Sequence, residues 1–117
     1  MLIKDLFDAI TIGNKANEKL QLAARLLDCK DNPDICKDGL KILDSIGVGS
    51  NPGFGKEIIG ASVYYMKALF YQALSDDTMA KYCLNVVEEI PQWYVIYGRD
   101  TLLDIKEEAR KLRRQID

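Results

Sequence analysis

The side chains that could do acid–base chemistry in this chain are carboxylates, because its 117 residues include no histidine. Histidine is the commonest general base near neutral pH. Two acidic pairs stand out, Asp76-Asp77 and Glu88-Glu89. The first pair falls at the start of a predicted helix, where the helix dipole favours negative charge, and the second falls on a predicted solvated face. We therefore expect no catalytic residues and a protein that is not an enzyme.

Three cysteines could in principle bind a metal or form a disulfide, but their number and spacing favour free thiols. Cys29 and Cys36 flank a short segment that a disulfide could close, although Cys36 also falls at a small-residue packing position of a predicted helix. A zinc site would need Cys83 as well, plus a carboxylate. An odd number of cysteines without a secretory signal fits a reducing compartment. We expect no metal, no cofactor and a cytoplasmic location.

A glycine-rich segment, residues 47–55, invites comparison with phosphate-binding loops. Such loops present backbone amides to an anion at the start of a helix. A P-loop here would need glycine at Ser50 and serine or threonine at Glu57, and it should follow a strand rather than a helix. The dinucleotide-binding pattern from Gly47 is broken by Pro52. We interpret the segment as a connection between two helical units.

The elements around these residues show an internal repeat with an offset of 44 residues, which aligns residues 35–46 with 79–90. In both segments apolar residues recur every three or four positions, which is typical of an amphipathic helix. Asn32 and Asp76 precede the two helices in the same register and are predicted N-caps. The segments before them follow the same offset, so each unit is a pair of helices.

The spacing of small and large apolar residues resembles that of tetratricopeptide repeats (TPRs). The residues that carry the resemblance are Leu20, Ala24, Leu27, Cys36, Leu40 and Leu43 in the first unit, Tyr64, Ala68, Tyr71, Ala80, Leu84 and Val87 in the second, and Ile105, Ala109 and Leu112 near the end. Two features depart from the family. Lys67 stands where TPRs usually have a large apolar residue, and the units are 44 rather than about 34 residues apart.

The resemblance implies an all-α fold, a right-handed array of antiparallel helical hairpins with a C-terminal capping helix. We predict one domain over residues 1–117, with repeat one at about residues 18–47, repeat two at about 62–91 and the closing helix at about 100–116. No stretch reaches the roughly 18 apolar residues that a membrane-spanning helix requires, so we expect no membrane contact.

Aromatic residues gather in the second half of the chain. Tyr64 and Tyr71 lie on the predicted apolar stripe and are assigned to the core, whereas Tyr65 points off that stripe, toward the predicted surface. Three more follow in the connection to the closing helix, at Trp93, Tyr94 and Tyr97. They either pin the closing helix or form an exposed patch. We expect pinning.

The TPR resemblance implies a concave groove lined by the first helix of each unit and by the closing helix. The side chains that would line it are Gln21, Arg25, Tyr65, Leu69, Lys106 and Arg110. Such a groove would have basic ends and an apolar middle, suited to an extended acidic peptide. The leading prediction is therefore a non-catalytic adaptor that binds a protein or peptide.

Two alternatives use other surfaces. A nucleic-acid-associated module would use the basic residues of the last helix, Arg110, Lys111, Arg113 and Arg114, although the net charge of −2 argues against nucleic acid as the partner. A self-assembling protein, most simply a homodimer, would use the apolar stripe of residues 1–12. That stripe would otherwise pack on the first hairpin.

Overall fold

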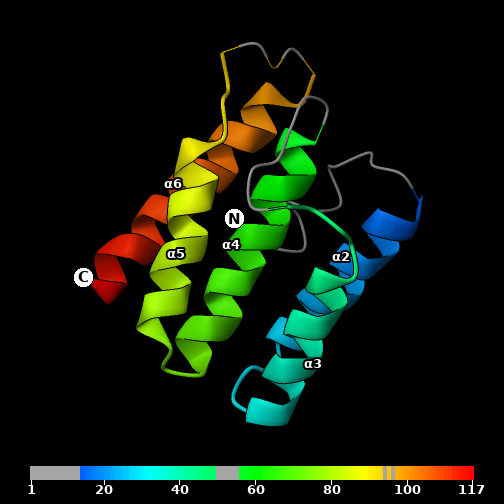
Figure 1. Cartoon of the computed structure of the whole chain (residues 1–117), viewed down its shortest axis with the longest axis vertical. Coiled ribbons are helices and arrows are strands. Elements are labelled where there is room, and N and C mark those ends of the chain that lie inside the picture. Colours follow the sequence, from blue (N-terminus) through cyan, green and yellow to red (C-terminus); the bar gives the residue numbers. More distant parts are fainter. Residues whose placement is uncertain (1–13, 50–55, 94, 96) are drawn as a thin grey trace.

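The computed structural model describes residues 14–49, 56–93, 95 and 97–117, and this part of the chain is helical without strands (Figure 1). The helices are α2 (Asn14–Leu27), α3 (Pro33–Asp44), α4 (Glu57–Ala73), α5 (Asp77–Glu89) and α6 (Arg99–Ile116). The predicted all-α class is thus confirmed. The apolar stripe of residues 1–12 and most of the glycine-rich connection lie outside the described residues.

Local capping fixes where α3 and α5 begin. The Asn32 side chain accepts the N–H of Asp34 at 3.0 Å, and Pro33 occupies the first helical position, where a missing N–H costs nothing. The Asp76 carboxylate accepts the N–H of Met79 at 3.1 Å. Each cap satisfies an amide that has no partner within its own helix and stabilises the helix by about 1 kcal/mol. Both predicted N-caps are confirmed.

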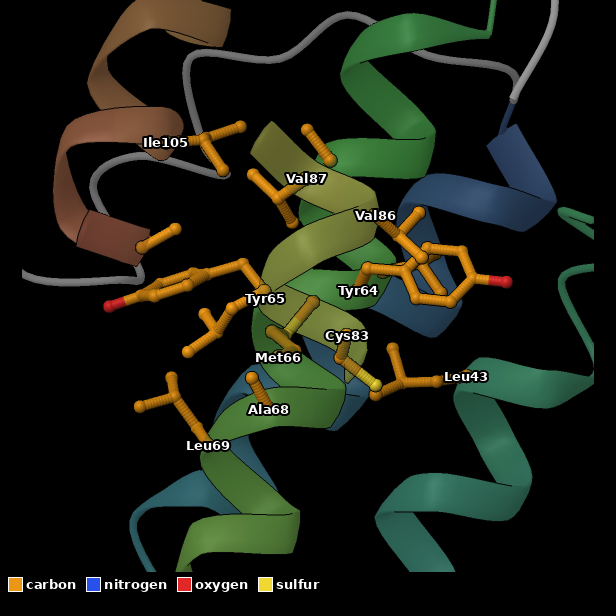
Figure 2. Packing of buried hydrophobic residues seen from close by; sticks show 14 of the residues in the cluster. Leu43, Tyr64, Tyr65, Met66, Ala68, Leu69, Cys83, Val86, Val87 and Ile105 are labelled. Atoms are coloured by element: carbon orange, nitrogen blue, oxygen red, sulfur yellow. The ribbon is translucent and has the colours of Figure 1, made fainter. Parts of the chain in front are cut away.

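Helix α4 occupies the centre of the molecule. It packs against α2, α3, α5 and α6, while α2 also packs on α3 and α5 on α6. Eleven of its 17 residues are buried, and they lie on all of its faces. A helix that is apolar all round belongs in a core. Figure 2 shows Tyr65 and Tyr64 leaving α4 toward different neighbouring helices.

The packing of α3 on α4 depends on a glycine. Gly39 is buried, and a methyl group added to it would overlap the ring of Phe70, which has no exposed surface. The absence of a side chain at this position lets the backbone of α3 approach α4 closely. Leu43, near the end of α3, contributes a second buried contact to the same core.

Lys67, the residue that departs from the TPR pattern, lies at the junction of α3 and α4. Its Nζ is 2.5 Å from the Asp44 carboxylate and 4.9 Å from the centre of the Tyr64 ring. The apolar stem of a lysine can cover a hydrophobic surface while its charge finds a partner at the edge. A lysine can therefore fill a position at which an apolar side chain was expected.

Candidate interaction surface

The predicted groove begins on α2, where Gln21 is half-buried and Arg25 is exposed. The pattern of apolar residues on α2 explains both positions, because Leu20, Ala23 and Leu27 are buried and turn these two polar residues away from the core. Of the two predicted groove residues on α2, Arg25 is the more exposed.

The middle of the predicted groove is buried. Tyr65 and Leu69 expose only 6% and 8% of their surface, so the expectation that Tyr65 points toward an open surface is wrong. The reason is the central position of α4, since α6 covers the side from which both residues project (Figure 2). Burial raises the pKa of the Tyr65 hydroxyl to about 12, and the nearby Glu108 carboxylate adds to the shift.

Lys106, predicted to form a basic end of the groove, faces α5 instead. It is 4% exposed, and its Nζ donates to the carbonyl oxygens of Glu88 at 3.1 Å and Ile90 at 2.5 Å. These are among the last carbonyls of α5 and the residue that follows it, which have no partner within the helix. Burial lowers the pKa of Lys106, although the Glu88 carboxylate opposes that shift. Lys106 therefore closes the end of α5 and offers no charge to a ligand.

Arg110 also turns toward α5. Its Nε and Nη2 donate to the two carboxylate oxygens of Glu88 at 3.0 and 2.9 Å, a bidentate pair in which both side chains are half-exposed. The predicted basic groove end is thus already paired within the chain. The register explains the error, because residues 106 and 110, one turn apart on α6, both face the end of α5.

Two further basic residues of α6, Lys111 and Arg113, are engaged in similar pairs. Arg113 donates to the side chains of Asp117 and Asn85, and Lys81 of α5 pairs with Asp117 at 2.9 Å. Lys111 pairs with Glu108 at 3.2 Å. The contacts of Asn85 and Lys81 join α5 to the end of α6. Together with the Arg110–Glu88 pair, these contacts engage three of the four residues of the basic patch that a nucleic-acid-binding module would need.

The connection between α5 and α6 displays its aromatic residues. Trp93 is 78% exposed and Tyr97 is 91% exposed, so the expectation that these two residues pin the closing helix is wrong. Val95, only 9% exposed, belongs to the core and is the buried residue among the described positions 93, 95 and 97. Tyr94 lies outside the described residues. Sequence reasoning could not find this surface, because an apolar segment between two helices fits either outcome.

Two contacts fix this connection on the protein, and a hydrogen bond within the connection adds to them. The N–H of Val95 donates to the carbonyl of Gln92 at 3.2 Å, and Lys106 holds the carbonyl of Ile90. At its far end Gly98 has a φ of 76°, and a methyl group there would overlap the end of the Ile58 side chain on α4. The connection is therefore anchored at both ends, with the two aromatic side chains between its anchors.

The structure offers little to a cofactor or metal. Within the described residues no group of three or more potential ligands could hold a metal ion, and no helix is long and apolar enough to cross a membrane. Cys29, Cys36 and Cys83 are free thiols.

Comparisons of the chain with models of protein families, with curated proteins and with solved structures found no match.

Proposed function

We propose that this chain is a non-catalytic protein-binding module built as a short TPR-like array. The order of packing supports the array. Each helix packs on the next along the chain, and α4 also packs on α2 and α6, as successive antiparallel hairpins with a closing helix would do. The offset of 44 residues between the two units and the matching N-caps Asn32 and Asp76 support the same arrangement.

The single observation that carries the binding function is the exposure of Trp93 and Tyr97. Large aromatic side chains bury 150–250 Å² each in folded proteins or interfaces, about 25 cal/mol for every Å² removed from water. Trp and Tyr are also enriched among the residues that dominate protein–protein binding energy. Two of them held outside the core on an anchored connection therefore form a contact surface for another protein, which we call the aromatic surface.

The groove contributes less to this proposal than the aromatic surface does. Tyr65, Leu69 and Lys106 are buried, and Arg110 is paired with Glu88, which leaves Arg25 and the neighbouring Gln21 as its accessible residues. A charge reversal at Arg110 would place two carboxylates side by side on α5 and α6. It would thus perturb the fold, and Arg25→Glu is the appropriate test of the groove.

Affinity capture with matched variants tests the proposal. The wild-type chain, a Trp93→Ser/Tyr97→Ser double variant and Arg25→Glu are each immobilised and exposed to lysate with and without nuclease treatment, and the retained proteins are quantified by mass spectrometry. Tyr82→Ser serves as the control, because Tyr82 is also exposed, at 45%, but lies on α5 away from the connection. We expect a protein that wild type and Tyr82→Ser retain and that the double variant loses.

The other outcomes separate the alternatives. A protein lost with Arg25→Glu and kept by the double variant would place binding on the groove. If the double variant retains the same proteins as wild type, the aromatic surface is not the contact. Material that disappears on nuclease treatment would favour the nucleic-acid alternative.

A further inference from the structure

The turn between α2 and α3 brings an exposed and a buried thiol into one short segment. Cys29 follows the end of α2 and is exposed, whereas Cys36 is the fourth residue of α3 and has no exposed surface. Two backbone hydrogen bonds close the turn between them. The N–H of Asn32 donates to the carbonyl of Cys29 at 3.0 Å, and the N–H of Cys36 donates to the carbonyl of Asn32 at 3.1 Å.

The thiol of Cys36 reaches back across this turn toward Cys29. Its Sγ donates to the carbonyl oxygen of Lys30 at 3.1 Å, and Lys30 is the residue directly after Cys29. The buried sulfur therefore lies against the Lys30–Asp31 peptide unit, which is one peptide unit away from the exposed cysteine. Both thiols belong to the same segment of eight residues, so the chain between them is short.

We propose that Cys29 and Cys36 form a redox-sensitive modification site that reacts with a low-molecular-weight disulfide of the glutathione type. The thiolate of Cys29 attacks the small disulfide, forms a mixed disulfide and releases one small thiol, which takes up a proton. The thiolate of Cys36 then attacks the Cys29 sulfur and releases the second small thiol. Two protein thiols are oxidised, and one small disulfide is reduced to two thiols.

The difference in exposure sets the order of the two steps. Cys29 meets the reagent first because it is exposed. Burial raises the pKa of Cys36, although the nearby Lys30 opposes the shift, so its thiolate forms mainly when the turn opens. A disulfide also requires the two Cα atoms to lie within about 7 Å of each other. Closure of the disulfide is therefore slower than attachment of the first small thiol, and it withdraws Cys36 from the core.

Cys83 provides an internal control for this chemistry. It lies in the core on α5 at 1% exposure, and burial raises its pKa to about 12. Cys83 should therefore stay reduced and unmodified while the pair in the α2–α3 turn reacts.

The experiment follows the full-length chain in oxidised glutathione by intact mass and by peptide mapping. We expect an early mixed disulfide on Cys29, followed by a product two hydrogens lighter than the reduced chain, in which Cys29 and Cys36 are linked. Cys29→Ser should prevent both products. Cys36→Ser keeps a hydroxyl that can still donate to the Lys30 carbonyl, and it should stop at the mixed disulfide. Circular dichroism of each variant verifies that it is folded.

Two results would overturn the proposal. One is a wild-type chain that keeps the mixed disulfide on Cys29 as long as folded Cys36→Ser does. The other is oxidation that joins two chains through Cys29 without any link to Cys36.

Discussion

The turn between α4 and α5 and the connection between α5 and α6 each follow the end of a helix, where the last carbonyl groups have no partner within that helix. In the turn the hydrogen-bond partners are close in sequence, and in the connection they are distant. At the end of α4, Ser75 adopts a left-handed φ of 61°, and the N–H of Asp76 donates to the carbonyl of Tyr71 at 2.9 Å. Asp76 then caps α5 with its side chain. This turn satisfies the helix ends with residues close in sequence, in the manner of a Schellman motif.

The end of α5 instead depends on a residue from another helix. Its terminal carbonyls receive the ammonium group of Lys106, 16 to 18 residues further along the chain. The connection itself exposes most of the surface of Trp93 and Tyr97. The difference teaches that the α4–α5 turn closes with partners close in sequence, whereas the α5–α6 connection depends on a distant lysine and also displays two large, mostly exposed side chains.

The largest effect should come from removing the distant partner of α5. Lys106→Met keeps the apolar stem but takes the ammonium group away from the carbonyls of Glu88 and Ile90. A buried polar group left without a partner costs about 1–3 kcal/mol, so we expect the free energy of unfolding to fall by about 3 kcal/mol. Chemical denaturation measures this change. Unchanged stability would mean that water replaces the ammonium group at no cost.

A smaller loss should follow from a side chain at the far anchor of the connection. Gly98→Ala forces an L-residue to keep a left-handed φ and overlaps Ile58, which should cost about 2 kcal/mol. Gly47→Ala is the matched control, because Gly47 has a similar φ of 78° with nothing within 4 Å. Its cost should be about 1 kcal/mol, and the difference between the two variants isolates the overlap. Equal losses would contradict the close contact with Ile58.

The local turn should respond in the opposite direction. Ser75→Gly removes the strain of a left-handed serine, so the melting temperature should rise, with a gain of about 1 kcal/mol in unfolding free energy. Differential scanning calorimetry compares this variant with Ser45→Gly, at a serine in a right-handed conformation, where glycine should give no gain. A loss of stability at position 75 would show that the serine side chain makes a contact worth more than the strain.

The smallest effect on stability should come from the aromatic surface. Trp93→Ser/Tyr97→Ser should change the unfolding free energy by less than about 0.5 kcal/mol, because substitutions at exposed positions rarely do more. Thermal melts of the variant and wild type provide the measurement. A large destabilisation would mean that the two side chains serve the fold, and it would remove the main argument for a binding surface.

The features that could be predicted from the sequence are those whose partners are close in the chain. Asn32 and Asp76 each bond an amide two or three residues away, so their roles follow from position alone. The apolar period likewise indicated helices in these regions and core residues such as Leu20, although it missed others such as Met66 and Phe70.

The side chains next to an apolar stripe were harder to place. Tyr65 and Lys106 both lie at the edge of such a stripe, and a helical period does not tell which edge meets a neighbouring helix. That depends on how α4, α5 and α6 pack together, which involves residues far apart in the chain. The exposure of Trp93 and Tyr97 could not be predicted from the sequence for the same reason. It depends on where Val95 and Gly98 contact the rest of the protein.

The hydrogen bonds from Lys106 also affect which parts of the protein unfold locally as one unit. The last turn of α5 cannot lose its hydrogen bonds to α6 without a movement of α6, and the Arg110–Glu88 pair ties the same two helices together. Amide protons near the end of α5 and in the middle of α6 should therefore exchange with solvent in a common opening event. The two helices then behave as one cooperative unit, and the aromatic residues between them keep their position for as long as that unit stays closed.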